Sequence, residues 1–238
     1  EKLFQYMKGG LRPEYQNNEN LRNVRGVGGL SISRATLCTK IQESPQLINV
    51  DVTGPGACVA LILMYLQSHN RSIMQKMQVP NTKYLLEYLR PDMVLLRVAG
   101  KNLIGWDYIE PTEEWIAENI PSACKEENIS GEHGLKGTSD SSKYSSDQDA
   151  DESWLRSVYA HSIAGCCFAL GLRFAGTGRE DVFQLIIHQI QKLEANHNPS
   201  EKPFVNYCVL VCISALACIM SGRGNVDLVN IILSNVFF

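Results

Sequence analysis

The chain has 238 residues, of which 45% are hydrophobic, so it can bury a sizeable core and is not a disordered tail. Its 22 Lys and Arg residues stand against 25 Asp and Glu residues, and the formal net charge of -3 provides no global field to attract nucleic acid or an anionic membrane. We therefore expect no nucleic-acid or membrane partner, and we expect partners to be recognised by shape and local contacts.

The first 48 residues are a lead-in whose range 17–29 is rich in Gly, Asn and Arg, a composition typical of a loop. Gly26–Gly29 within it faintly resembles a nucleotide-binding loop. However, Ser31 takes the place of the third glycine of G-x-G-x-x-G, and no hydrophobic strand precedes it. We predict no nucleotide site here.

Internal repeats begin after the lead-in. Gly56–Tyr65 has the sequence GACVALILMY and Gly165–Phe174 has GCCFALGLRF; both start with Gly, contain Ala-Leu at the same place and end in an aromatic residue. Ala215–Asn225 (ALACIMSGRGN) matches Ala169–Arg179 (ALGLRFAGTGR), including two glycines near the end. Such self-similarity predicts a repeat architecture.

The spacing of the copies predicts one more, degenerate repeat. Gly165 lies 46 residues before its counterpart Val211, near the upper end of helix-pair repeats of roughly 40–47 residues. The distance from Gly56 to Gly165 is about two periods once the Ser, Asp and Gly-rich stretch 130–153 is set aside. We therefore expect a degenerate repeat near Val94–Asn119.

Each repeat is expected to have a first helix of small and large apolar residues, a Gly-rich turn and an amphipathic second helix. Small residues in the first helices let neighbouring helices approach closely. The second helices are predicted at Thr82–Leu89, Asp181–Leu193 and Val226–Val236, and Thr112 is the predicted N-cap of the corresponding helix in the degenerate repeat. The fold class is therefore all-α, an α-solenoid.

The predicted organisation has four parts: a lead-in over 1–48, two repeats over 49–129, a disordered insert over 130–153, and two further repeats over 154–238. For the insert, we favour a tolerated surface insertion over a regulated or partner-binding loop. Since repeat units need neighbours to bury their apolar faces, we expect the chain to be part of a larger repeat array.

Six of the eight cysteines lie inside apolar helical runs, where cysteine behaves as a small hydrophobe: Cys58, Cys166, Cys167, Cys208, Cys212 and Cys218. This usage favours a reducing compartment, cytosol or nucleus, over secretion. The longest apolar stretch, Tyr207–Met220, is shorter than the roughly 20 residues that span a bilayer, so it predicts a buried helix.

We assign no catalytic, cofactor-binding or metal-binding residue. The conceivable nucleophile is Cys166 or Cys167 with His161 on the same helix, but nothing there would lower the thiol pKa, and a packing role is favoured. Cys208 and Cys212 share a helix face without a nearby histidine, which indicates core packing.

Two glycine motifs are interpreted as parts of the fold and not as phosphate- or anion-binding loops. Gly100-Lys101 is followed by Asn102 where a P-loop needs Ser or Thr. Gly176-Thr177-Gly178 could present N–H groups to an anion, but its recurrence as Gly222-Arg223-Gly224 favours a repeat turn that needs positive φ. Trp106, Trp115 and Trp154 lack interleaved basic residues and are expected to be packing anchors.

Asn49–Ala57 (NVDVTGPGA), followed by a helix that ends in Met64-Tyr65, resembles the proteasome/cyclosome repeats. Three further segments make the chain resemble, more specifically, the family of the largest subunit of the anaphase-promoting complex, subunit 1: Asn70–Ile73, Pro91–Arg97 with Trp106-Asp107, and Ala160–Thr177. The likeness covers the chain from about Asn49 onward.

This resemblance implies an arc of an α-α toroid and a non-catalytic scaffold of a multi-subunit ubiquitin ligase that controls mitotic progression. It also implies contacts with other subunits of that complex, including the catalytic module and the coactivator side, no cofactor and no small-molecule substrate, and a location in nucleus and cytoplasm. The alternative with the same repeats is a non-ATPase docking scaffold of the proteasome regulatory-particle base. A cysteine-dependent hydrolase is a third hypothesis.

Overall fold

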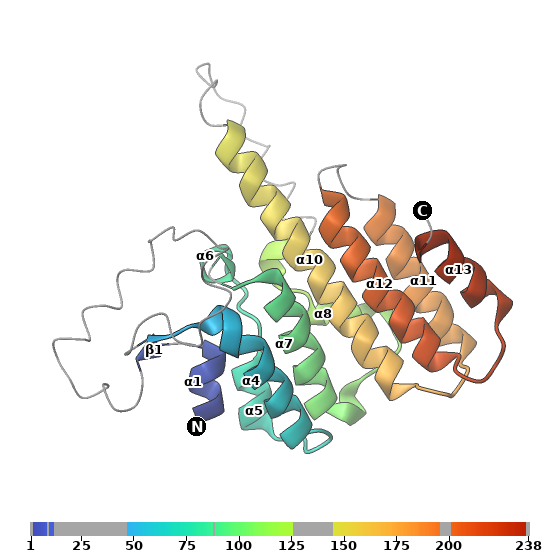
Figure 1. Cartoon of the computed structure of the whole chain (residues 1–238), viewed down its shortest axis with the longest axis horizontal. Coiled ribbons are helices and arrows are strands. Elements are labelled where there is room, and N and C mark those ends of the chain that lie inside the picture. The colour runs from blue at the N-terminus through green and yellow to red at the C-terminus, as the bar shows by residue number, and fades with distance from the viewer. Residues whose placement is uncertain are drawn as a thin grey trace. The chain divides into compact units, whose positions relative to one another are not determined.

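The computed structural model describes residues 2–8, 10–11, 47–87, 89–125, 145–195 and 201–236; for 8, 10–11, 47, 145–152 and 235–236 it describes the backbone (Figure 1). The chain divides into two compact units, Glu1–Tyr65 and Leu66–Phe238. This division falls inside the range 49–129 predicted to hold the first two repeats, and the predicted domain boundaries stay predictions.

The first unit joins a short lead-in helix to the first repeat helix. Its elements are α1 (Lys2–Lys8), β1 (Gly10–Leu11), β2 (Leu47–Ile48) and α4 (Val50–Met64). The two short strands pair antiparallel, with Gly10 opposite Ile48. Asn49 caps α4 by accepting the Asp51 N–H at 3.2 Å, and the Thr53 hydroxyl donates to the Tyr6 carbonyl of α1 at 2.8 Å. Neither α1 nor the strands were predicted from the sequence, and the predicted loop 17–29 lies outside the described residues.

The second unit is a stack of helices. Its elements are α5 (Arg71–Met77), α6 (Lys83–Leu86), α7 (Pro91–Ile104), η3 (Trp106–Tyr108), α8 (Glu113–Asn119), η4 (Ser122–Cys124), α10 (Ser145–Arg173), α11 (Glu180–Ala195), α12 (Lys202–Ile219) and α13 (Val226–Val236). In Figure 1, α10 lies between α7 and α12 and packs on both. The helices pack in sequence order, which confirms the all-α solenoid.

The predicted helices are found with small shifts at their ends. α13 has the predicted bounds, and α11 begins one residue earlier than predicted. α7 and α8 occupy the predicted degenerate repeat, and the Thr112 hydroxyl accepts the Trp115 N–H at 3.2 Å as the predicted N-cap. α6 ends at Leu86, short of the predicted Leu89, and Pro91 soon starts α7. Proline restricts the residue before it, so α6 cannot run on into α7.

The insert prediction needs a correction at its carboxyl end. α10 begins at Ser145, so residues 145–153 are helical, while 130–144 lie outside the described residues. His161 consequently lies in the middle of α10 and not near its start.

Small residues bring the first helices close together, as predicted. A Cβ placed on Gly171 of α10 would lie 2.6 Å from both Cα and Cβ of Ala215 in α12. A Cβ on Gly165 would lie 2.7 Å from the Leu95 carbonyl oxygen of α7. Gly56, the aligned counterpart of Gly165, is exposed, and a Cβ there would meet no described atom within 4 Å. The aligned glycines therefore have different roles.

In the part of the chain that the structure describes, two helices, α10 over Ser153–Arg173 and α12, are long and apolar enough to cross a membrane by length and composition alone. The apolar window of α10 is 78% buried and that of α12 is 44% buried inside the structure. α10 packs against α7 and α12, so apolar residues on both of these sides are buried, as expected for a central helix of a solenoid. α12 keeps a substantial apolar face uncovered.

Candidate interaction surface

The first helix of every repeat ends in the same hydrogen bond. The N–H of the C-cap residue donates to the carbonyl four residues earlier: Tyr65 to Leu61 (3.1 Å), Gly105 to Lys101 (3.1 Å), Phe174 to Leu170 (2.9 Å) and Met220 to Leu216 (3.0 Å). The degenerate repeat ends its first helix at Gly105 in this way, although its sequence shares little with the other copies. This bond is the ordinary end of an α-helix, which α6 also has between the Glu87 N–H and the Lys83 carbonyl, and it marks where each first helix stops.

Three of the four turns that follow, those after α4, α10 and α12, use two residues with positive φ at fixed positions. These are Gly176 (71°) and Gly178 (62°) after α10, Gly222 (76°) and Gly224 (63°) after α12, and Gln67 (57°) and His69 (54°) after α4. The prediction that the recurring glycines serve positive φ is confirmed. Positive φ was not predicted for Gln67 and His69, which stand at the same offsets after Tyr65 as the glycines do after Phe174.

Two of these turns make equivalent junctions with the end of the next first helix. The Gly176 and Gly178 N–H groups donate to the carbonyls of Cys218 and Ile219 in α12, at 2.9 and 3.0 Å. The Gln67 and His69 N–H groups donate in the same way to Leu103 and Ile104 of α7, at 3.1 and 3.0 Å. These bonds satisfy carbonyls that a helix end leaves without an intrahelical partner.

Side chains connect the turns laterally. His69 Nε2 lies 3.1 Å and Arg173 NH2 3.6 Å from the two carboxylate oxygens of Asp107, and the Arg173 guanidinium stacks over Trp106 at 5.3 Å. Further along, Arg223 NH2 donates to the carbonyl of Thr177, its equivalent 46 residues earlier, at 3.0 Å. We call residues 66–70, 105–108, 174–179 and 220–225 the turn edge.

Replacing Gln67 by glycine is expected to raise the free energy of unfolding by up to about 1 kcal/mol, because a residue with a Cβ pays a steric penalty of this size at positive φ. The Gln67 side chain is exposed, so little packing is lost. Thermal and urea unfolding of the two proteins measure the difference. Gln75→Gly, inside α5, is the control and should destabilise by about 1 kcal/mol; destabilisation by Gln67→Gly would contradict the assignment of the turn.

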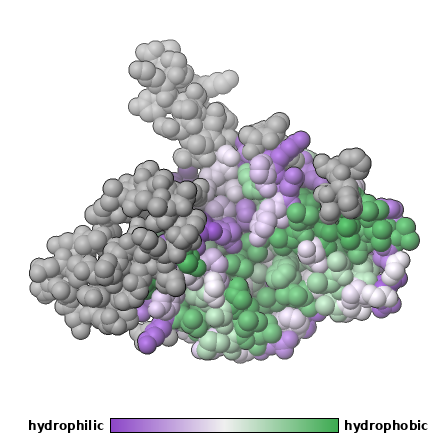
Figure 2. All heavy atoms as spheres, viewed as in Figure 1, coloured by the Kyte–Doolittle hydropathy of each residue, from purple (hydrophilic) through white to green (hydrophobic). Residues whose placement is uncertain are grey.

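The last described helix pair carries an apolar surface on its outer side. Five large hydrophobic side chains are exposed there: Tyr207 (48%), Leu210 (44%), Val226 (69%), Val229 (51%) and Leu233 (48%). The first two share a stripe of α12 with Ser214 and Ala217, and the other three form a stripe of α13. Figure 2 shows hydrophobic residues gathered over this part of the molecule. We call these seven residues the open face.

The cysteines and His161 considered as catalytic candidates lie in the core. Cys166, Cys167, Cys208 and Cys212 are fully buried between α10 and α12. Desolvation raises the pKa of Cys166 and Cys208 far above the ordinary thiol value, and it raises the pKa of Cys124 to about 12. Such thiols stay protonated at neutral pH and are poor nucleophiles, so the geometry favours packing. Among the described residues, no group of three or more His, Cys, Asp or Glu is placed to hold a metal ion.

His161 Nδ1 lies 2.7 Å from the Ser157 carbonyl, to which a protonated Nδ1 donates, and its ring is 5.8 Å from the ring of Tyr207. Burial lowers the pKa of His161, and this outweighs the hydrogen bond to Ser157 and the charge of Asp92, which raise it. The unfolded chain thus binds this proton more tightly than the folded chain. Stability should be lost as pH falls below about 6.5, the unfolded value, towards the folded pKa.

We expect His161→Gln to flatten the pH dependence of unfolding between about pH 5 and 7, by at most about 1.4 kcal/mol per pH unit for one proton. Urea unfolding of both proteins across this range measures the slope. His188→Gln is the control, because His188 is half exposed beside Glu113. Equal slopes for the His161 variant and the parent chain would contradict the expected linkage.

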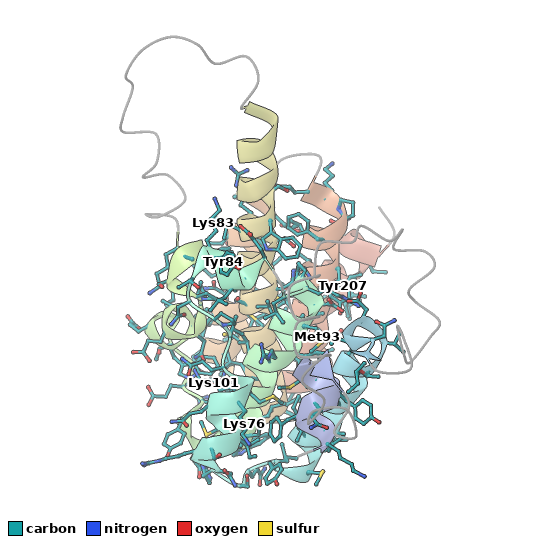
Figure 3. All side chains as sticks on the ribbon, turned by 90° about the vertical axis from the view of Figure 1, so that its left-hand side faces the viewer. Lys76, Lys83, Tyr84, Met93, Lys101 and Tyr207 are labelled. Atoms are coloured by element: carbon teal, nitrogen blue, oxygen red, sulfur yellow. The ribbon has the colours of Figure 1, made fainter. Side chains whose placement is uncertain are left out.

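A small polar cavity of about 70 Å³ lies between the ends of α5 and α8, lined in part by Gln78, Asn81, Arg97, Lys101 and Asn119. Arg97 NH2 donates to the Lys76 carbonyl at 3.2 Å, and Lys101 Nζ donates to Asn119 Oδ1 at 3.1 Å. The two cations therefore lie near the carboxyl ends of α5 and α8, where the helix dipole makes positive charge stabilising. Figure 3 labels Lys76 of α5 and Lys101 of α7. Gly100-Lys101 lies inside α7 and forms no phosphate loop, and Gly26–Gly29 lies outside the described residues.

The three tryptophans lie in helical elements of the second unit. Trp115 is buried on α8, and Trp106 stacks with Arg173 at the turn edge. Trp154 is half-buried near the first described side chains of α10. These positions agree with the predicted role as packing anchors.

Comparison with known proteins identifies the family. The family model described as "APC1 fifth domain" matches residues 1–235. Among curated proteins, the chain is 32% identical to "Anaphase-promoting complex subunit 1" of Mus musculus over 238 residues, covering 97% of this chain and 11% of that protein. It is 34% identical to the protein of the same name from Arabidopsis thaliana, covering 75% of this chain and 11% of that protein.

A third relative, "Negative regulator of mitosis" of Emericella nidulans, is 29% identical over 87% of this chain and 10% of that protein. The chain thus spans about a tenth of the length of the curated relatives that it matches. The match over nearly the whole chain, together with the stacked helix pairs, shows that the chain belongs to the APC1 fifth domain family.

Proposed function

We propose that the chain serves in a scaffold subunit of the anaphase-promoting complex, a multi-subunit ubiquitin ligase that controls mitotic progression. The observation that carries the proposal is the stack of helix pairs, joined by repeated hydrogen bonds at the turn edge, in a chain of the APC1 fifth domain family. Such a stack presents an extended surface to partners. Catalysis of ubiquitin transfer is assigned to other subunits.

The partners proposed are other subunits of the complex, including the catalytic module and the coactivator side. The large exposed side chains of the open face support protein partners, since apolar patches of this kind mark interaction sites. The names of the relatives favour this function over that of a docking subunit of the proteasome base.

The proposed location is nucleus and cytoplasm. Free cysteines buried in the core, such as Cys166 and Cys212, fit a reducing compartment. Imaging of the tagged protein tests this part of the proposal, and secretion of the protein would contradict it.

The test of function is isolation of the tagged protein from its own cells, with quantitative mass spectrometry of what co-purifies. Recovery of ubiquitin-ligase subunits in constant proportion to the bait is the expected result. Recovery with proteasomal ATPases instead would overturn the proposal in favour of the alternative. To test the non-catalytic assignment, the complex carrying Cys218→Ala should retain its ubiquitin-transfer rate, since Cys218 is the described cysteine that is not fully buried.

A further inference from the structure

The polar cavity at the ends of α5 and α8 has walls that are restricted in conformation. Residues 78–81, which follow α5, and 120–121, which follow α8, line two of its sides. Each segment contains a proline, Pro80 or Pro121, whose ring fixes φ. Ile120 has the ψ of 129° that a residue before proline prefers. The cavity is therefore preorganised, which lowers the entropic cost of binding a group inside it.

The helix α7 supplies the positive charge of this cavity. Arg97 is buried, and its guanidinium is held by the bond to the Lys76 carbonyl. Lys101, one turn later, is half-buried and donates to Asn119 Oδ1, which also accepts from Asn102 Nδ2 at 3.2 Å. An ammonium group has three N–H donors, and within the described residues Lys101 has no second acceptor and no salt bridge. Its charge is thus partly withdrawn from water without a described counter-charge, which is unfavourable.

The lining favours a ligand with a single negative charge. Its two cations stand against one carboxylate, Glu118, which is exposed on the rim, so the formal charge of the lining is +1. The carboxyl ends of α5 and α8 add negative potential, which opposes a phosphate group of charge about −1.5 to −2 more than a carboxylate. The side-chain amides of Gln78 and Asn81, exposed on the rim without a described partner, can donate to carboxylate oxygens.

We propose that the cavity binds one carboxylate group, carried by an aspartate or glutamate side chain of another subunit. This inference rests on the proposed function, because a scaffold is what brings the chain of another subunit to this surface. The cavity of about 70 Å³ is several times larger than the roughly 10–15 Å³ that one water molecule needs, so a carboxylate group fits. Lys101 Nζ donates to the bound carboxylate, and the buried charge of Arg97 adds to the attraction.

Carbodiimide crosslinking of the complex isolated from its own cells tests the contact directly. The reagent joins a lysine amine to a carboxylate that touches it, with loss of water and without a spacer. The expected product, identified by mass spectrometry, is an amide between Lys101 Nζ and an aspartate or glutamate of another subunit. The pair Lys192 and Glu113, 3.3 Å apart within this chain, is the internal positive control.

The other outcomes of the crosslinking experiment would overturn the proposal. A link from Lys101 to Glu118, or to a carboxylate elsewhere in the same polypeptide, would show that the cavity is closed from within. A link from Lys101 to a phosphorylated side chain would show that the ligand chemistry is wrong. No link at Lys101, with Lys192 joined to Glu113, would show that no carboxylate enters the cavity.

Substitutions measure what the charge contributes to binding. Lys101→Met should speed dissociation of the crosslinked subunit from the complex by about tenfold or more, whereas Lys101→Arg, which keeps the charge, should change it by less than about threefold. Glu118→Gln leaves the bond between Lys101 and Asn119 intact and should slow dissociation by about twofold, because it removes a repulsive charge. Lys192→Met, which breaks an exposed ion pair elsewhere, is the matched control and should change nothing.

Equal dissociation rates for Lys101→Met and the parent complex, or faster dissociation for Glu118→Gln, would contradict the proposal. The inference fails separately from the proposed function. Co-purification of ubiquitin-ligase subunits without a crosslink at Lys101 would remove the carboxylate site and leave the scaffold function. Co-purification with proteasomal ATPases would remove the proposed function itself.

Discussion

Gly171→Ala is expected to lower the free energy of unfolding by about 1–3 kcal/mol, the usual cost of overpacking a tight contact. The added methyl group would lie 2.6 Å from Cα and Cβ of Ala215, so α10 and α12 would have to move apart. This cost opposes the gain of about 1 kcal/mol that alanine brings over glycine inside a helix. The tertiary contact therefore predicts that Gly171→Ala lowers the free energy of unfolding, whereas helix propensity alone predicts that it raises it.

Gly56→Ala is the matched control, because Gly56 is also inside a helix but is exposed, with no described atom near the added methyl group. It should stabilise its helix by about 0.5–1 kcal/mol. Hydrogen exchange of α10 amides for the first variant and of α4 amides for the second measures each change locally. Stabilisation by both substitutions would show that the α10–α12 contact is looser than the structure has it.

Leu216→Ala is expected to lower the free energy of unfolding by about 2–5 kcal/mol, because it leaves a cavity in a packed core. Leu216 of α12 is 0% exposed, and its carbonyl accepts the C-cap N–H of Met220. The backbone bond survives the substitution, so the loss reports side-chain packing. Leu170→Ala, at the equivalent buried position of α10, should cost a similar amount.

Leu233→Ala on the open face is the control for this series and should change stability by no more than about 0.5 kcal/mol, since Leu233 is 48% exposed. Urea unfolding monitored by circular dichroism gives the three values. If Leu233→Ala were as costly as Leu216→Ala, the open face would already be covered in the isolated chain, most simply by self-association, and a dependence of stability on protein concentration would reveal this.

Local sequence patterns predicted most of the second unit. The glycines at 176, 178, 222 and 224 predicted turns with positive φ because few other residues adopt that conformation at low cost. Thr112 predicted the start of α8 because its hydroxyl can satisfy an otherwise unpaired N–H group. The apolar period over Asp181–Leu193 predicted the amphipathic helix α11, whose buried face includes Gln189.

Other features could not be predicted because non-local contacts determine them. Gln67 and His69 adopt positive φ where their types give no signal, and the hydrogen bonds of their N–H groups to the end of α7 hold them there. α10 extends into a Ser and Asp-rich stretch that composition assigned to a disordered insert. The helix packs on α7 and α12, and extending a helix that has already formed costs less than starting one, so a weak local preference can be enough at its end.

The sequence by itself determined the all-helical repeat, its 46-residue period and the glycine turns, because each follows from local conformational preference and the periodicity of apolar residues. Only the tertiary structure decided which repeated surfaces are covered. His161 and Tyr207 occupy equivalent positions, yet one is buried against α12 and the other is half exposed on the open face. Burial depends on which helix lies opposite, and no pattern within a single repeat specifies that neighbour.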